Sequence, residues 1–286
     1  MTLIAEAEAE TRTAPPRRSR RPLGDAGVYL AALVVAVALL WAVAPNLFTS
    51  ADPLAVQPAL RFRPPSADHW FGTDQLGRDL YTRVVYGARA SLTGAGVAVA
   101  LAVLVGAILG TVAGWFGGVT DSVIGRAIDV VLSIPGFLFA ITIVVLLGFG
   151  VLQAAVAVGL TSSATFARLI RSEVLKARSS NYVEAAITSG ASTFAILRRH
   201  VLPNSFTATL ALITVQFGIA IIWIASLSFL GLGAQPPQPE WGLLVSDGRN
   251  YIASRGWLTL WPGLTVVAVV LATNHLSHHL GRRRTP

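Results

Sequence analysis

The sequence predicts an all-α, polytopic membrane protein with six transmembrane helices. Of its 286 residues, 53% are hydrophobic and only 13% are charged, and the mean hydropathy is +0.63. Water-soluble globular domains carry about 25% charged residues, so this composition indicates a chain that lies in a bilayer. The positions of the charge-free runs and of the arginines predict the number of helices and their orientation.

Long runs without Asp, Glu, Lys or Arg define the helices. They cover 26–48, 90–120, 130–167, 201–239 and 256–274, and about 20 apolar residues suffice to cross the hydrocarbon core. The third run is too long for one helix, and Gly148 and Gly150 predict a tight hairpin that divides it. The transmembrane domain is therefore expected over 23–286, with spans near 26–48, 90–114, 128–147, 151–170, 205–231 and 257–279 and a loop over 171–204.

Arginine and lysine are unevenly divided between the two sides of this six-helix arrangement. The side that holds both termini and the 171–204 loop carries fifteen of the 22 cationic residues, and the other side carries seven. Cytoplasmic loops are enriched in Lys and Arg, so both termini are expected in the cytoplasm. The net charge of +8 then reflects topology and attraction to anionic lipid rather than nucleic-acid binding.

The N-terminal region resembles a targeting signal, with a basic stretch, an apolar core and a small-x-small site at Ala42 to Ala44. The apolar core is long enough to span, Pro45 follows the site, and five more spans come after it. We therefore expect a retained first helix, preceded by a disordered cytoplasmic tail over 1–22.

The second span has a small residue at every fourth position. Close approach of neighbouring helix backbones is favoured by such a pattern, and four residues turn a helix slightly more than once, so the stripe should meet more than one neighbour. Its members are Ala90, Gly94, Ala98, Ala102, Gly106, Gly110 and Gly114.

Catalytic and cofactor-binding motifs are missing from the sequence. A P-loop requires Gly-Lys before Ser or Thr, but the only lysine, Lys176, follows Leu175, and no cysteine is present. The expected spans carry no ionisable groups at their centres, which disfavours an ion-coupled transporter. We expect no enzymatic activity, no cofactor and no metal site in this chain. A metal site at His275, His278 and His279, which share a helix face, is the less favoured alternative to interfacial side chains.

Residues 181–204, "NYVEAAITSGASTFAILRRHVLPN", form a polar module in this apolar chain. Asn181 and Glu184 have the spacing of a capping box for a short helix. Gly190 can adopt the left-handed conformation that ends it, Ser192 can cap a second helix, and Pro203 closes the module. The pattern predicts a cytoplasmic helix-turn-helix.

Helices this short need a surface to pack on. Phe194, Leu197 and Val201 lie at helical spacing and form a narrow apolar edge. The edge suits a groove in another protein, or it folds back on its own bundle. Spacing alone leaves both interpretations open.

The segment "EAAITSGASTFAILRRHVLP" resembles the EAA loop of ABC importer permeases. Its matching residues are Glu184, Ala185, Ala186, Gly190, Leu202 and Pro203, while His200 stands where an aliphatic residue is usual. The stretches "FGTDQLGRDLYTRVVYGARASL" (71–92) and "SFLGLGAQPPQPEWG" (228–242) are similar to the second membrane subunit of the dipeptide and oligopeptide branch. The resemblance covers about 25–280, and the "NHLSHHLGRRR" ending departs from the acidic ending common in that branch.

This resemblance implies a type I ABC importer permease fold in the cytoplasmic membrane. It further implies a second permease subunit, two ATPase subunits that use ATP and Mg²⁺, and an extracytoplasmic binding protein that delivers peptides. Nickel, haem or glutathione are alternative cargoes, and a non-transporting scaffold is a less favoured alternative function. The residues expected to couple to the ATPases are Glu184, Ala185, Ala186, Gly190, Phe194, Leu197, His200, Leu202 and Pro203.

Two further expectations concern the non-cytoplasmic side. Segments 46–89 and 234–240 are candidates for contact with the binding protein. The amphipathic rings of four tryptophans are expected at the outer interface: Trp70, Trp241, Trp257 and Trp261.

Overall fold

The computed structural model describes residues 22–181, 183, 188–190, 192–196, 199 and 202–282. Every regular element in this part of the chain is a helix, and its only β contact is an isolated bridge between Thr73 and Asp79. The predicted all-α class is therefore confirmed for the described residues. Residues 1–21 of the expected tail lie outside them.

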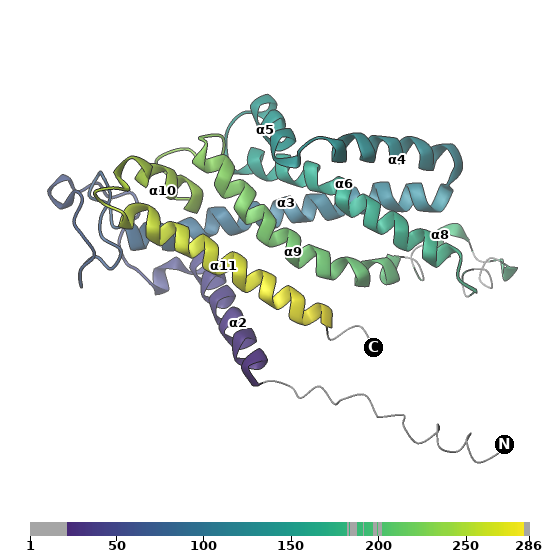
Figure 1. Ribbon diagram of the computed structural model, residues 1–286, viewed down its shortest axis with the longest axis horizontal. Coiled ribbons are helices and arrows are strands. Elements are labelled where there is room, and N and C mark those ends of the chain that lie inside the picture. Colours follow the sequence, from purple (N-terminus) through teal and green to yellow (C-terminus); the bar gives the residue numbers. More distant parts are fainter. Residues whose placement is uncertain are drawn as a thin grey trace, which may run out of the picture.

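The helices form one elongated bundle (Figure 1). In chain order they are α2 (Pro22–Val43), α3 (Leu80–Phe116), α4 (Gly118–Ser133), α5 (Gly136–Leu147), α6 (Val151–Arg178), α8 (Thr193–Ile196), α9 (Leu202–Phe229), α10 (Trp241–Gly248) and α11 (Trp257–Arg282). Short 3-10 turns occupy Pro45–Leu47, Pro58–Leu60 and Arg249–Tyr251.

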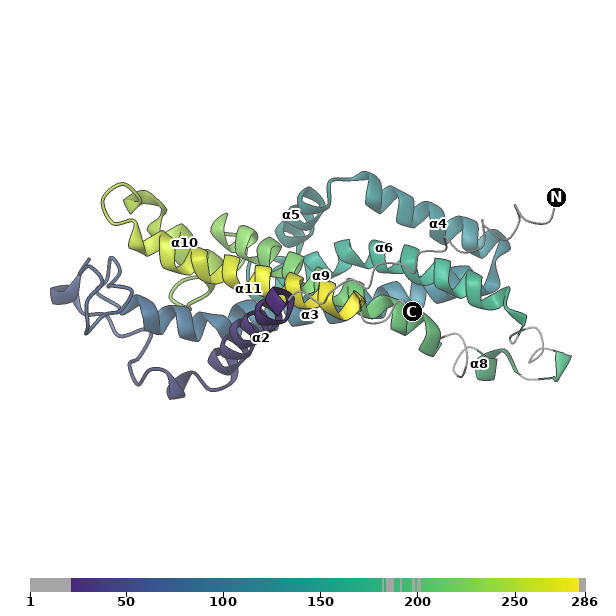
Figure 2. The same cartoon turned by 60° about the horizontal axis from the view of Figure 1, so that its bottom comes forward.

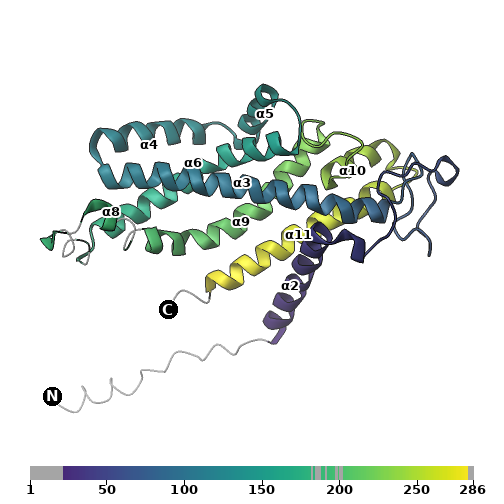
Figure 3. The same cartoon turned by 180° about the vertical axis from the view of Figure 1, so that it is seen from behind.

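The two ends of the bundle differ in structure. Segment 48–79 and α10 lie at one end, and α8 lies at the opposite end (Figures 1 and 3). We refer to these as the α10 end and the α8 end. The longest helix, α3, connects them, and α2 packs on α11 and α3 (Figure 2).

Four helices of the described chain are long and apolar enough to cross a membrane. They are the stretches Ala26–Val43, Leu80–Phe116, Thr209–Phe229 and Trp257–Ser277, and the bent pair of α4 and α5 provides a fifth if it counts as one span. The remaining expected span, near 151–170, corresponds to α6, which has 28 residues but is made more polar by side chains such as Gln153, Thr161 and Ser162. The six-span count is thus met only in part.

The stretch near 128–147, expected as one span, is two helices. α4 ends at Ser133, α5 begins at Gly136, and their axes differ by 96°. Ile134 between them is extended, with φ −87° and ψ 135°. The ring of Pro135 disfavours the helical conformation for the residue before it, which accounts for the break.

Small residues let α3 and α6 approach closely, and this is the most extensive helix contact in the bundle. A Cβ added at Gly110 would lie 2.6 Å from the carbonyl oxygen of Ala167, and one at Gly114 would lie 2.9 Å from Cβ of Val174. A Cβ at Gly94 would instead meet Val151 of α6 and Ile224 of α9. The small-residue stripe meets more than one neighbour, as predicted.

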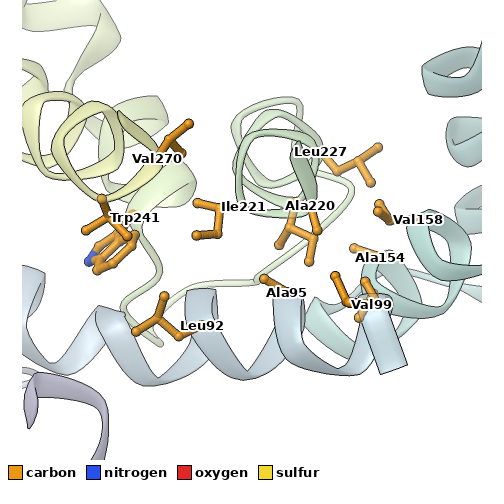
Figure 4. Close-up of a cluster of buried hydrophobic side chains, with 14 of the residues drawn as sticks. Leu92, Ala95, Val99, Ala154, Val158, Ala220, Ile221, Leu227, Trp241 and Val270 are labelled. Atoms are coloured by element: carbon orange, nitrogen blue, oxygen red, sulfur yellow. The ribbon is translucent and has the colours of Figure 1, made fainter. Parts of the chain in front are cut away.

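The main apolar core lies where α3, α6, α9, α10 and α11 converge (Figure 4). Side-chain hydrogen bonds also connect α9 to its neighbours inside the bundle, where polar side chains commonly bond across helices. Gln216 of α9 donates to Oγ of Ser162 on α6 at 2.6 Å, and Thr214 and Ser277 connect α9 to α11 at 2.7 Å. These contacts fix the register of α9 between its two neighbours.

Candidate functional site

The connection between α6 and α9 contains the residues predicted to couple to an ATPase. Glu184, Ala185, Ala186, Leu197 and His200 lie outside the described residues. The structure places Gly190 at a turn, Phe194 in α8, and Leu202 and Pro203 at the start of α9. Pro203 occupies the first turn of α9, where its missing N–H costs no helical hydrogen bond.

The turn between the two short helices has the conformation that its sequence predicts. Gly190 has φ +78°, in the left-handed region, and a Cβ there would meet nothing within 4 Å. Oγ of Ser192 accepts from the backbone N–H of Ala195 at 3.3 Å, which is the predicted cap. Asn181 is already helical, so the first helix begins one residue earlier than the capping-box interpretation implies.

Part of the connection packs on its own bundle. Val183 and Ile196 are buried in a cluster with Phe166, Ile170 and Val174 of α6. These contacts attach the segment firmly to α6 at the α8 end. The side chains of the predicted apolar edge, Phe194, Leu197 and Val201, lie outside the description, so both interpretations of that edge stay open.

The α10 end contains a capping turn built by the 71–92 segment. Oδ1 of Asp74 accepts from the backbone N–H of Leu76 and Arg78, at 2.8 and 3.0 Å, and Oδ2 pairs with Nε of Arg78 at 2.7 Å. Asp79 caps α3 by accepting from the N–H of Thr82 at 2.8 Å, and it also contacts Nδ1 of His69 at 3.0 Å. The turn therefore fixes the first residues of α3.

The 228–242 segment docks on this same part of α3. Glu240 is fully buried, caps α10 through the N–H of Leu243 at 3.0 Å, and accepts from the hydroxyl of Ser91 at 2.8 Å. Burial raises the pKa of Glu240 above its ordinary value. The hydrogen bonds from Ser91 and from the backbone of Gly242 and Leu243 lower the pKa and so oppose this rise. The carboxylate thus joins α10 to α3.

The next two residues complete this contact. Trp241 is fully buried, and its indole N–H donates to the carbonyl of Val84 at 2.9 Å. A Cβ on Gly242 would lie 2.5 Å from Cα of Ala225, so only glycine lets α10 pack this closely on α9. The expectation that Trp241 lies at the membrane interface is therefore wrong, because its ring fills the space between helices.

One buried arginine lies between two carboxylates of this end. Arg83 is 1% exposed, and its Nη1 and Nη2 lie 3.7 Å from Asp74 and Asp247, respectively. Burial raises the pKa of Asp247, while the positive charge of Arg83 opposes that rise. The contact between the 71–92 and 228–242 segments could not be predicted from the sequence. The one signal for this contact was that both segments contain ionisable residues.

At the α8 end, ion pairs connect α4 to α6. Arg171 forms a bidentate pair with Asp121, and Nη2 of Arg168 lies 2.7 Å from Oδ1 of Asp129. Arg126, three residues before Asp129 on α4, is not its partner in the described contacts. Asp129 instead bonds across to α6, which a local spacing rule cannot anticipate.

No group of three or more His, Cys, Asp or Glu side chains that could hold a metal ion occurs among the described residues. The side chain of His278 lies outside that description. His275 lies beside Gly27 of α2, where a Cβ on the glycine would be 3.1 Å from its Nε2.

The fold and these sites define a polytopic helical membrane protein whose connection between α6 and α9 carries the short helix α8 at one end of the bundle. The chain belongs to the family of binding-protein-dependent transport system inner membrane components, whose model matches residues 102–286.

Curated relatives cover nearly the whole chain. It is 39% identical over 271 residues to the dipeptide transport system permease protein DppC of Alkalihalophilus pseudofirmus, covering 94% of this chain and 89% of that protein. It is also 40% identical over 216 residues to the glutathione transport system permease protein GsiD of Pectobacterium atrosepticum, covering 76% and 72%.

The fold is also similar to that of a solved structure. The inward-facing MetNI methionine ABC transporter superposes with a TM-score of 0.58 at 17% identity, covering 72% of this chain and 98% of that chain. The chain therefore has the fold of an ABC transporter membrane subunit.

Proposed function

We propose that this chain is one of two permease subunits of an ATP-driven peptide importer, and that residues 171–204 couple it to the ATPases. The observation that carries the proposal is the connection between α6 and α9, in which left-handed Gly190 forms a turn and Ser192 caps α8. Membership of a binding-protein-dependent transport family supports it.

The attachment of this segment suits a mechanical role. Val183 and Ile196 pack on α6, and the segment continues directly into α9. A displacement imposed on the segment by a partner would therefore be passed to both helices.

Each remaining residue of the predicted set has a role in this proposal. Glu184 caps the first helix, and Phe194 and Leu197 are the apolar anchors in an ATPase groove. Small side chains at 185 and 186 permit close docking, His200 lies at the rim of the contact, and Leu202 and Pro203 begin α9. ATP and Mg²⁺ are bound by the partner ATPases, and this chain itself has no cofactor and no catalytic activity.

Orientation follows from the same assignment. The α8 end is cytoplasmic, both termini lie in the cytoplasm, and the chain resides in the inner membrane, in agreement with the arginine distribution. The α10 end then faces the binding protein. Gln235 and Gln238 are exposed there, whereas Glu240 of the same loop is buried.

Peptides are the proposed cargo because a dipeptide system is among the most similar relatives. Glutathione is the second candidate, since a glutathione permease subunit is similarly close; nickel and haem remain less supported alternatives. Uptake of a labelled dipeptide by cells that carry the complete system tests this choice. Competition by unlabelled peptides supports the proposal, and uptake competed only by glutathione contradicts it.

The coupling role is tested with a double variant, Phe194→Ala with Leu197→Ala, expressed with the ATPases, the second permease and the binding protein. Loss of both anchors should release the ATPases in a pull-down and abolish hydrolysis stimulated by the binding protein. The matched control truncates two exposed apolar residues of α2, Leu30→Ala with Leu40→Ala, and should retain both properties. An anchor variant that behaves like the control would show that the segment serves only its own bundle.

Glu184 is tested separately because its cap can be formed by glutamine. Glu184→Gln should retain most of the stimulated hydrolysis if capping is its main role. Glu184→Lys should lose it, because the change removes the acceptor and places a positive charge at a helix N-terminus. Equal activity of the two variants would contradict the capping role.

A further inference from the structure

A groove of about 370 Å³ runs between α2 and α11. Leu33 and Val37 of α2 form one wall, and Leu264 and Ala268 of α11 form the other. Thr265 also lines it, but its hydroxyl already donates to the carbonyl of Trp261 at 2.9 Å. The walls are therefore apolar, without a free hydroxyl.

Both walls belong to helices that are long and apolar enough to span the bilayer. Only 11% of the α2 stretch Ala26–Val43 is buried, and Leu33 and Leu264 remain 60% and 47% exposed. Such side chains are stable where hydrocarbon surrounds them. The groove thus opens sideways, at the depth of the acyl chains.

An aromatic cluster closes the groove toward the α10 end. Phe71 stacks on Trp261 with ring centroids 4.6 Å apart, and Tyr81 contacts Phe71 at 5.3 Å and Trp41 at 6.3 Å. Aromatic rings of this kind collect at the boundary between hydrocarbon and headgroups. The closed end of the groove is therefore at the level of the lipid ester groups.

Two hydrogen-bond donors in this cluster lack acceptors. The indole N–H groups of Trp41 and Trp261 are both buried and make no hydrogen bond to the described residues. Buried donors in native proteins are almost always paired, and leaving one unpaired is costly. The ester carbonyl and phosphate oxygens of a phospholipid are acceptors available at this depth.

We propose that the groove between α2 and α11 holds one acyl chain of a phospholipid, whose ester or phosphate oxygens accept from the indoles of Trp41 and Trp261. The bound lipid fills the space between α2 and the rest of the bundle. This site goes beyond the importer function and does not depend on the cargo or on the coupling segment.

The test uses the full chain, with the subunits that copurify, in bilayer discs containing phosphatidylglycerol with a photoactivatable diazirine in its acyl chain. Cross-links should concentrate on peptides of α2 and α11 that line the groove. Ala268→Phe places a ring in the groove and should reduce this labelling several-fold. Val267→Phe adds the same ring to a neighbouring position, 52% exposed and outside the groove lining, and should leave it unchanged.

A second pair of variants tests the donors without filling the groove. Trp41→Phe and Trp261→Phe retain the aromatic cluster but remove the N–H groups, and each should lower the number of phospholipids retained per chain in native mass spectrometry after detergent washing. The labelling could instead spread evenly over all lipid-exposed helices, with no difference between Ala268→Phe and Val267→Phe. That result would show only general contact with the bilayer and no specific site. Groove cross-links to another subunit instead of lipid would identify a protein occupant. Either result overturns the proposal.

Discussion

Glu240 combines complete burial with a full set of hydrogen bonds. Its two oxygens accept from Ser91 and Leu243, so that one side chain caps α10 and joins it to α3. Removal from water favours the neutral acid, and the donors around it favour the carboxylate. Burial is the larger of the two effects, so the pKa of Glu240 is raised.

This balance predicts how the stability of the protein depends on pH. Because folding raises the pKa of Glu240, its contribution is fully present below the ordinary glutamic acid value of about 4.3 and is lost as pH rises through the raised value. Glu240→Gln keeps an acceptor but does not ionise. The unfolding midpoint of the wild type, measured in detergent, should therefore fall more between about pH 5 and about pH 8 than that of the variant.

Glu240→Ala is the control for the cap itself. It leaves the buried donors of Ser91 and Leu243 unpaired and should cost roughly 1–3 kcal/mol of stability at low pH, where the contribution of Glu240 is fully present. Identical pH dependence in the wild type and in Glu240→Gln would show that Glu240 does not titrate in this range.

Burial of Glu240 and Trp241 could not be predicted from the sequence. Their partners Ser91 and Val84 lie about 150 residues earlier in the chain, and periodicity reports only local neighbours. Proline and acidic residues around Trp241 made the segment look exposed. Gly190, in contrast, was predictable because a turn between two short helices is a local property.

At the scale of elements, charge-free runs located the helices but not all of their ends. The expected second span began at Ala90 because Arg83 and Arg89 precede it, yet α3 begins at Leu80. Arg83 can lie in a helix here because Asp74 and Asp247 are close to it, and those partners come from distant segments. The break at Pro135 was missed because transmembrane helices also tolerate proline.

The packing of α3 on α6 predicts opposite outcomes for two helical glycines. A Cβ at Gly110 would lie 2.6 Å from the carbonyl oxygen of Ala167, whereas a Cβ at Gly125 of α4 would meet nothing within 4 Å. Gly110→Ala should destabilise the bundle by roughly 1–3 kcal/mol through overpacking. Gly125→Ala should leave the stability unchanged or raise it by up to about 1 kcal/mol, because alanine favours the helix and meets no neighbour.

Thermal unfolding of both purified variants, with yield from the membrane fraction as a second measure, distinguishes the two sites. Alanine is the better helix former at both positions, so any loss at Gly110 reports the contact rather than propensity. Equal stability of the two variants would mean that α3 and α6 can separate without cost.

At the scale of the whole molecule, the two ends have different chemistry. The α10 end is organised around buried carboxylates and arginines that fix segment 48–79 and α10 on α3. The α8 end carries two ion pairs between α4 and α6, and the short helix α8 follows α6 there. This difference between the two ends suits the proposed importer subunit, in which cargo arrives at the α10 end and the ATPases act at the α8 end.

The orientation of this arrangement is the last prediction, and three exposed residues test it. Ser66 and Gln238 lie at the α10 end, and Ser179 follows α6 at the α8 end. Single cysteines at 66 and 238 should react with an impermeant thiol reagent added outside intact cells, and a cysteine at 179 should react only after the cells are opened. The chain has no cysteine of its own, so the unmodified protein supplies the background. Arginine and lysine predominate on the side of Ser179, which favours a cytoplasmic position for it. Labelling of position 179 in intact cells would show that the orientation is the reverse. The 171–204 segment could then not couple to the ATPases.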